Sequence, residues 1–340
     1  MIVALDAMGG DFAPENNILG LKLALQEYPN LEKVAVVGQI DKMMPYIKEC
    51  RLENHPKIEL VQADEVIEMT DPSTAALRQK KKSSISICAK LLKKGEVDAI
   101  VSPGHTGAAV ASTVVFNRTL PGIDRPAIAT MFPSAKGFFV LLDVGANVDA
   151  KPVHLAQYAI LGEIYAELIL GIKNPSIGVL SNGEEDSKGC ELTKEAHKLI
   201  KTLNLNNFVG NVESGDLYRG DVDVAVCDGF VGNIFLKTSE SLAKTLTSVL
   251  KESMMKNVIR MAGGRLSKGA FRELKELTNN ELYGGAPLLG INGACIIGHG
   301  SSSPIAVQNA IRVAKEMIEK GVNTRITEKL NKVEWPEIEN

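Results

Sequence analysis

The chain has 340 residues, 45% of them hydrophobic, and a formal net charge of −3 from 38 basic and 41 acidic side chains. This near balance gives no sign of nucleic acid as a partner. Only Met1 precedes the first apolar run, and no run approaches the roughly 18 apolar residues of a membrane span, so we expect a cytoplasmic protein. The five scattered cysteines fit reduced thiols in packed elements.

Short apolar runs alternate with helical patterns along almost the whole chain, starting with a strand at 2–7 and a helix at 14–28. Further strands are predicted at 33–38, 57–62, 97–102, 127–132, 138–143, 176–181, 208–213, 222–227 and 293–298. Further helices are predicted at 40–50, 73–94, 106–116, 153–170, 190–203, 232–262, 267–278 and 303–320. The alternation predicts a mostly parallel, doubly wound sheet in an α/β/α sandwich. Since no repeat or linker divides the chain, we expect a single α/β domain over residues 1–340.

One pair of predicted strands breaks the alternation, because no helical pattern separates 127–132 from 138–143. We expect a hairpin there. Glycine also stands beside polar residues directly after six of the predicted strands. The six turns are residues 6–11, 102–107, 143–147, 181–186, 228–233 and 299–303.

Ligands of open α/β sheets bind at the carboxyl ends of the strands. We therefore expect these six turns to meet at one edge of the sheet, in a polar cleft whose backbone N–H groups suit an anion. For any single turn, a backbone requirement for glycine is an equally good explanation.

Several catalytic signatures are absent from the sequence. It contains no dinucleotide-binding, P-loop or zinc-protease motif, and no nucleophile elbow. The five histidines show no metal-ligand spacing. The sequence thus predicts no metal and no cofactor, and a cleft without an obvious covalent nucleophile.

Five segments resemble the phosphate acyltransferases of the PlsX type, in the same order along the chain. They are DAMGGD (6–11), LLDVGAN (141–147), LSNGEEDSKG (180–189), VCDGFVGNIFLK (226–237) and YGGAPLLGINGACIIGHGSS (283–302). The resemblance runs from Asp6 to about Ile318. One turn departs from the family pattern, because His105 stands where the family usually has Asn.

The resemblance implies transfer of a fatty acyl group from acyl carrier protein to inorganic phosphate, without a cofactor. The acyl phosphate product would pass to a membrane glycerol-3-phosphate acyltransferase at the start of phospholipid synthesis. The resemblance also implies a homodimer, and a fold like the isocitrate/isopropylmalate dehydrogenases and the phosphotransacetylases. The alternative functions are a short-chain phosphotransacetylase that uses a coenzyme A thioester, a metal- and NAD-dependent β-decarboxylating dehydrogenase, and a silent scaffold.

Because phosphate is itself the nucleophile, the site needs to position it and stabilise an oxyanion. The predicted catalytic residues are Lys188, Asp228, His105 and His299. The predicted phosphate or substrate contacts are Asp6, Gly9, Gly10, Ser102, Gly104, Thr106, Asn147, Asn182 and Asn233. The alternatives remain open: Asp6 and Asp11 could only cap a turn, and Lys188 could be a solvated surface charge.

Residues 251–275 differ from the rest of the chain, since they carry seven basic and two acidic side chains along an apolar helical stripe. The predicted contacts of this segment with a membrane or carrier protein are Met254, Val258, Met261, Lys256, Arg260, Arg265 and Lys268. Packing on the core or on a dimer mate is the alternative. Binding to anionic lipid would make the protein peripherally membrane-associated.

Overall fold

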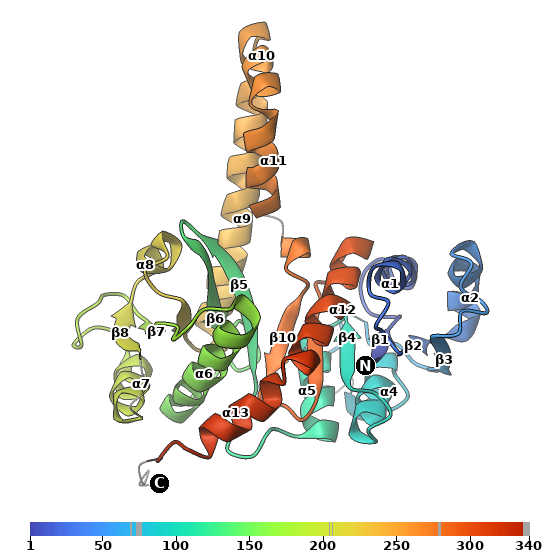
Figure 1. The fold of residues 1–340 in the computed structure, drawn as a ribbon, viewed down its shortest axis with the longest axis horizontal. Helices are drawn as coiled ribbons and strands as arrows, with labels where there is room; N and C mark the ends of the chain where they lie inside the picture. Colours follow the sequence, from blue (N-terminus) through green and yellow to red (C-terminus); the bar gives the residue numbers. More distant parts are fainter. Residues whose placement is uncertain (69, 73–76, 204, 206, 278–279, 336–340) are drawn as a thin grey trace.

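The fold is built on one eleven-stranded sheet, in the order β3-β2-β1-β4-β11-β10-β5-β6-β9-β7-β8 (Figure 1). The computed structural model describes residues 1–340 except 69, 73–76, 204, 206, 278–279 and 336–340. The strands are β1 (Ile2–Asp6), β2 (Lys33–Gly38), β3 (Ile58–Gln62), β4 (Ala99–Ser102), β5 (Ala127–Ser134), β6 (Gly137–Leu142), β7 (Ile177–Leu180), β8 (Phe208–Val212), β9 (Val224–Val226), β10 (Ala286–Leu289) and β11 (Ala294–Ile297). All ten predicted strands are confirmed, and β10 is additional.

The direction of the strands reverses in the middle of the sheet. Strands β1 to β4 and β11 are parallel to one another, and β6 to β9 form a second parallel set. Between them, β11, β10, β5 and β6 are joined by three antiparallel pairings, which include the predicted β5–β6 hairpin. The two parallel sets therefore point in opposite directions.

This reversal makes one sequence prediction wrong. The six glycine turns do not share one edge: those after β1, β4 and β11 lie at one end of the strands, and those after β6, β7 and β9 lie at the other. The physical reason is that three antiparallel pairings separate the two parallel sets, and an odd number of them reverses the strand direction. The sequence pattern predicted only one of the three, the β5–β6 hairpin. The molecule thus offers two groups of turns rather than one.

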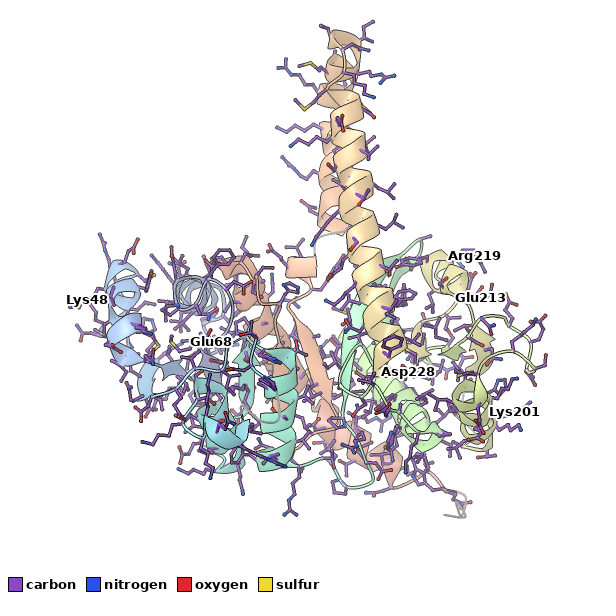
Figure 2. All side chains as sticks on the ribbon, turned by 180° about the vertical axis from the view of Figure 1, so that it is seen from behind. Lys48, Glu68, Lys201, Glu213, Arg219 and Asp228 are labelled. Atoms are coloured by element: carbon purple, nitrogen blue, oxygen red, sulfur yellow. The ribbon has the colours of Figure 1, made fainter. Side chains whose placement is uncertain are left out.

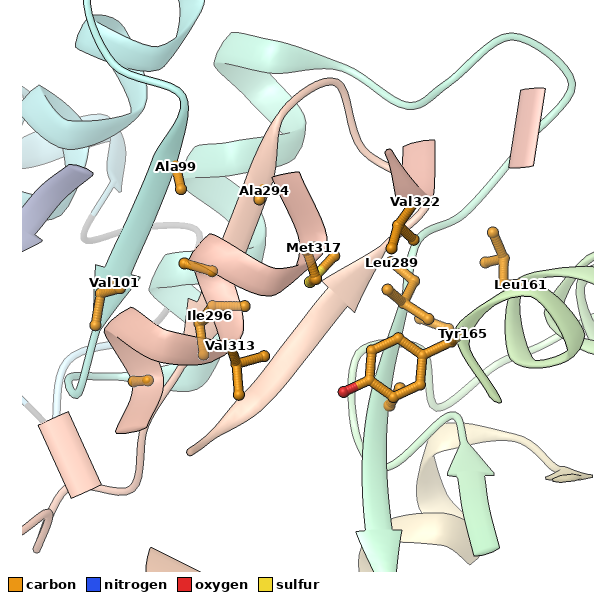
Figure 3. Close-up of a cluster of buried hydrophobic side chains, with 14 of the residues drawn as sticks. Ala99, Val101, Leu161, Tyr165, Leu289, Ala294, Ile296, Val313, Met317 and Val322 are labelled. Carbon is orange, nitrogen blue, oxygen red and sulfur yellow. The ribbon is translucent and has the colours of Figure 1, made fainter. Parts of the chain in front are cut away.

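Helices cover both faces of the sheet, as predicted. They are α1 (Glu15–Glu27), α2 (Ile40–Glu49), α4 (Ser84–Lys93), α5 (Thr106–Asn117), α6 (Pro152–Tyr165), α7 (Glu191–Thr202), α8 (Ser214–Arg219), α9 (Gly229–Met254), α10 (Val258–Leu266), α11 (Lys268–Leu277), α12 (Pro304–Glu319) and α13 (Val322–Leu330), with a π-helical turn at Ala166–Leu170 and a 3-10 turn at Asn280–Leu282. One buried cluster joins the sheet to α1, α2, α6, α7, α12 and α13. In it Val313 and Met317 of α12 lie over Ile296 of β11 (Figure 3). The second cluster joins the other face to α4, α5, α8 and the start of α9.

Two predicted helices differ from the observed ones. Residues 73–76 of the helix predicted at 73–94 lie outside the described residues, residues 77–79 are helical as predicted, and residues 80–83 interrupt the helix before α4 begins at Ser84. The Ser83 N–H donates to the Lys80 carbonyl oxygen and the Lys82 N–H to the Glu65 carboxylate, so the chain makes a turn here before α4 begins. The helix predicted at 232–262 is two helices. Helix α9 ends at Met254, and the Asn257 side chain caps the start of α10 at Val258.

The helix formed by Pro152–Leu170 is longer and more apolar than we expected of any run in the sequence. By length and composition it could span a membrane, but 72% of its apolar window is buried inside the protein. Tyr158 and Tyr165 on this helix are among the largest fully buried side chains. In this structure the segment serves as a core helix.

A helical arm extends away from the sheet (Figure 1). Helix α9 runs past the β5–β6 hairpin, and α10 and α11 return beside it. No residue of α10 is buried. The core therefore ends at the first turns of α9, and the basic segment lies entirely on the arm.

Candidate active site

The turns that follow β1, β4 and β11 meet through their glycines. The Asp11 N–H donates to the Gly300 carbonyl oxygen at 2.7 Å. A Cβ on Gly9 would lie 2.8 Å from the Gly104 nitrogen, and Gly10, at φ +98°, would meet the Gly300 carbonyl oxygen. Close backbone approach therefore requires glycine in this group, which we call the β1 turn group (residues 6–11, 102–107 and 298–303).

Asp6 is the buried centre of the β1 turn group. Its carboxylate accepts hydrogen bonds from the Ser102 hydroxyl at 2.7 Å and the Met8 N–H at 3.3 Å. Burial raises the pKa of this carboxyl above its ordinary value. The side chain of Asn17, on α1, donates to the Gly9 carbonyl oxygen at 2.9 Å. The aspartate thus holds the turn together, and its charge disfavours phosphate in direct contact with it.

His105 is the N-cap of α5. Its Nδ1 accepts from the Ala108 N–H at 3.2 Å, and its Nε2 lies 3.0 Å from the Asp71 carbonyl oxygen. This geometry fits the neutral tautomer with the proton on Nε2. Thr106, the first residue of α5, is exposed. A small pocket in front of this helix start is lined by Asp6, Met8, Gly9, Ile67, Ser84, Ile85, Ser102, Gly104, His105 and Ala108.

His299 lies in the same group of turns and is exposed. Its Nδ1 is 2.8 Å from the Ser301 hydroxyl and also accepts from the Ser301 N–H. A hydroxyl beside an imidazole is the minimal arrangement for nucleophilic catalysis. The structure shows no carboxylate on the other ring nitrogen among the described residues.

A second group of turns follows β6 and β9, and we call residues 143–147 and 228–233 the β6 turn group. Asp143 is its buried centre: its carboxylate accepts from the N–H groups of Ile128, Gly145, Ala146 and Asn147. Burial raises the pKa of Asp143, as it does for Asp6. The Asn147 side-chain amide donates to the Pro126 carbonyl oxygen, to Asp143 and to the Tyr158 hydroxyl. Asn147 therefore has its donors committed to structure.

Helix α9 starts against this turn, and Figure 2 labels Asp228 at the base of the helix. The Asp228 carboxylate caps it, accepting from the N–H groups of Phe230 and Val231 at 3.0 Å. The Gly229 N–H donates to the Asn147 carbonyl oxygen at 2.8 Å. A Cβ on Gly232 would overlap the Asp143 carbonyl oxygen, so the DGFVGN motif is explained by close docking of the helix on the turn. Asn233, half-buried, comes next and faces Gly145.

The loop after β7 carries Asn182 and Lys188, both exposed. Since β9 lies between β6 and β7 and is parallel to both, this loop is at the same end of the strands as the β6 turn group. Asn182 accepts from the Gly189 N–H at 2.8 Å, which closes the loop. The Lys188 ammonium forms no ion pair with any residue that the structure describes.

The structure therefore separates the predicted site residues. Asp228, Asn147 and Asn233 come together, with Asn182 and Lys188 on the neighbouring strand end. The other predicted phosphate contacts belong to the β1 turn group, together with His105 and His299. They are Asp6, Gly9, Gly10, Ser102, Gly104 and Thr106. The sequence prediction omitted Asp143 and Asn17. Asp143 ends a strand before glycine as Asp6 does, and this signal could have identified it, whereas the role of Asn17 depends on how α1 packs.

The described residues contain no group of three or more His, Cys, Asp or Glu side chains that could hold a metal ion. The cysteine nearest the β6 turn group, Cys227, is buried, and burial together with Asp143 raises the pKa of its thiol well above the ordinary value. It is therefore a poor nucleophile. The side-chain amides of Asn182 and Asn233 and the exposed Lys188 ammonium supply uncharged donors and a cation at this end of the strands, which suits anion binding.

Two solved structures show the same fold. A phosphotransacetylase from Streptococcus pyogenes aligns with a TM-score of 0.63 at 17% identity, covering 94% of each chain. A branched-chain phosphotransacylase from Enterococcus faecalis V583 aligns with a TM-score of 0.58 at 17% identity, covering 94% of this chain and 99% of the other. At such identities the likeness concerns the fold alone, and it confirms the phosphotransacetylase-like architecture.

Sequence relatives cover nearly the whole chain. A phosphate acyltransferase from Akkermansia muciniphila is 45% identical over 335 residues, which are 97% of this chain and 96% of the relative. One from Thermodesulfovibrio yellowstonii is 46% identical over 332 residues, 98% of this chain and 95% of the relative. Residues 1–325 also match the family described as "Fatty acid synthesis protein". The chain therefore belongs to this family, the PlsX-type phosphate acyltransferases that its motifs resemble.

Proposed function

We propose that this protein transfers a fatty acyl group from an acyl carrier protein thioester to inorganic phosphate, giving an acyl phosphate for phospholipid synthesis. The observation that carries the proposal is the identity of about 45% with phosphate acyltransferases over nearly the full chain. The structure adds a site suited to an anion and a fold shared with phosphotransacetylases.

Phosphate binds, in this proposal, between the β6 turn group and the loop after β7. Lys188 supplies a cation, and Asn182 and Asn233 supply uncharged amide groups at the same end of the strands. Asp143 and Asp228 hold the turn and the start of α9, so their carboxylates orient donors rather than contact phosphate. The β1 turn group, with His105 and His299, forms a second polar surface whose predicted catalytic roles stay predictions.

The chemical step is direct attack. A phosphate oxygen forms a bond to the thioester carbon, the carbon–sulfur bond breaks, and the electron pair leaves with the carrier thiolate, which takes a proton from solvent. Positioning two bound reactants lowers such a barrier by up to roughly 7–11 kcal/mol. The uncharged side-chain amide of Asn233 stabilises the intermediate oxyanion.

The rival step is an acyl-enzyme at Ser301, whose hydroxyl lies 2.8 Å from His299 Nδ1. Thiol exchange distinguishes the two. Labelled free carrier protein incubated with acyl carrier thioester, without phosphate, acquires acyl groups only through an acyl-enzyme. We expect no exchange in the wild type, and Ser301→Ala to retain turnover within about two-fold. Exchange that disappears in Ser301→Ala would establish the covalent route.

The arm supports a further part of the proposal, a peripheral position at the cytoplasmic membrane surface. At its tip Val258 is 81% exposed and Leu266 is 90% exposed, with Arg260, Arg265 and Lys268 beside them. Each cation near an anionic surface contributes about 1 kcal/mol, and each buried methylene about 0.8 kcal/mol. Shallow insertion of Met254, Val258 and Met261 would bring the product to its membrane glycerol-3-phosphate acyltransferase. The same basic face also suits docking of acidic acyl carrier protein.

The stem of the arm supports a homodimer. Leu242, Leu246 and Val249 are all exposed on α9 and recur at spacings of three and four residues, so they form one stripe. A stripe of this kind on an extended helix is typical of a helix-to-helix contact between two copies. Sedimentation of the wild type and of Leu246→Asp tests this part: a dimer that dissociates in the variant supports it, and a monomeric wild type refutes it.

A further inference from the structure

We propose that Phe230, Val231 and Ile234 at the start of α9, together with Val148, form the surface that receives the first part of the fatty acyl chain and favours fatty acyl donors over acetyl donors. This inference rests on the proposed function and adds the residues that hold the substrate's apolar chain.

These four side chains are exposed to an unusual degree for large apolar residues. Their exposed fractions are 59% for Phe230, 41% for Val231, 50% for Ile234 and 60% for Val148. Single exposed apolar residues are ordinary in soluble proteins, whereas a contiguous set indicates a binding surface. No described segment of the chain covers them.

The first turns of α9 are apolar on both sides. Gly229 and Gly232 dock on the β6 turn group, and Phe235 and Leu236 pack against the second core cluster. This is the core-facing side. Phe230 and Ile234 are four residues apart, and Val231 and Ile234 three apart, so they share the opposite side. A helix that is apolar all round is normally buried all round, which means that the outer side is completed by another molecule.

The position of this stripe relative to the chemistry identifies the occupant. Asn233, a proposed phosphate contact, lies between Gly232 on the docked side and Ile234 on the exposed side. Val148 follows Asn147, whose carbonyl oxygen accepts the Gly229 N–H. The stripe from Phe230 to Ile234 rises about 6 Å along the helix, and it begins within one turn of Asn233. A thioester whose carbon lies beside a phosphate held at Asn233 would carry its apolar chain directly onto this surface.

The experiment compares two donors, acetyl and palmitoyl carrier protein, in the wild type, Phe230→Ala, Ile234→Ser and the double variant. A lost methylene contact corresponds to about a four-fold change in kcat/KM. We expect each single variant to lower kcat/KM for palmitoyl by at least about four-fold and the double variant by about fifteen-fold, with acetyl unchanged, because its methyl group does not extend along the stripe. Val209→Ser, which is 48% exposed on the edge strand β8, is the matched control and should alter neither donor.

Three results would overturn the inference: equal losses for both donors, no loss for either, or dissociation of the variants from dimer to monomer in sedimentation. The last would assign the stripe to a second copy of the chain. A wild type that forms no acyl phosphate from either donor refutes the proposed function instead, so the two failures are distinguishable.

Discussion

Replacing Gly232 with alanine probes how closely α9 must dock on the turn after β6. The added Cβ would overlap the Asp143 carbonyl oxygen and lie 3.0 Å from the Cys227 sulfur. The carbonyl belongs to a backbone fixed by the hydrogen bonds to the Asp143 carboxylate, so no rotamer change relieves the clash. The start of α9 must move by about 1 Å to restore van der Waals separation.

That displacement has a calculable cost. It stretches the hydrogen bond from the Gly229 N–H to the Asn147 carbonyl oxygen beyond its present 2.8 Å. A lost hydrogen bond costs about 0.5–1.5 kcal/mol and overpacking about 1–3 kcal/mol. We expect Gly232→Ala to lower the free energy of unfolding by roughly 2–4 kcal/mol. Since Asn233 is the next residue, turnover should fall about 100-fold.

Urea unfolding and trapping of acyl phosphate with hydroxylamine measure the two effects. Gly263→Ala is the control: it lies in α10 with no atom within 4 Å of an added Cβ, so helix propensity should make the protein slightly more stable. If Gly232→Ala keeps wild-type stability and turnover, the docking argument is wrong.

Four further variants test individual residues and the basic face of the arm. Lys188→Ala should raise the KM for phosphate at least about ten-fold by removing a charge-assisted contact, with thioester affinity unchanged; steady-state kinetics with an unaltered KM would place Lys188 on the surface. Asp228→Asn should keep the thermal midpoint, because Asn caps a helix about as well as Asp, and lower turnover about ten-fold if the carboxylate charge acts in the reaction; full turnover would leave Asp228 only its cap. Val258→Asp should abolish cosedimentation with anionic vesicles and leave turnover in solution intact, whereas aggregation or unfolding would show that the arm's apolar stripe is core. Charge reversal at Arg265 and Lys268 should raise the KM for carrier protein if that face docks it, and an unchanged KM would exclude this role.

Much of the architecture was predictable from local pattern. The apolar strands, the hairpin at 127–143 and most helices follow from periodicity and glycine punctuation. Strand β10 was missed because its run, Ala286–Leu289, is four residues long and contains Pro287. Helix α13 was missed because its pattern follows directly on that of α12, with Gly321 as the separator.

The sequence predicted which turns carry the polar site residues but not which of these turns lie together. Which turns meet depends on the direction of each strand, and the antiparallel step at β10 carries no strong local signal. The sequence likewise indicated Asp6 and Asp228 as polar turn residues. Their roles as the hydrogen-bond centre of a buried turn and as a helix cap follow only from the folded contacts.

The central claim is that phosphate is the acyl acceptor. The most direct test incubates the protein with palmitoyl carrier protein, with and without inorganic phosphate, and measures thioester loss and hydroxylamine-trapped acyl phosphate together. Our account predicts that thioester is consumed only when phosphate is present and that one acyl phosphate forms for each thioester lost. Equal thioester loss without phosphate, with free fatty acid as the product, would contradict it and identify a hydrolase.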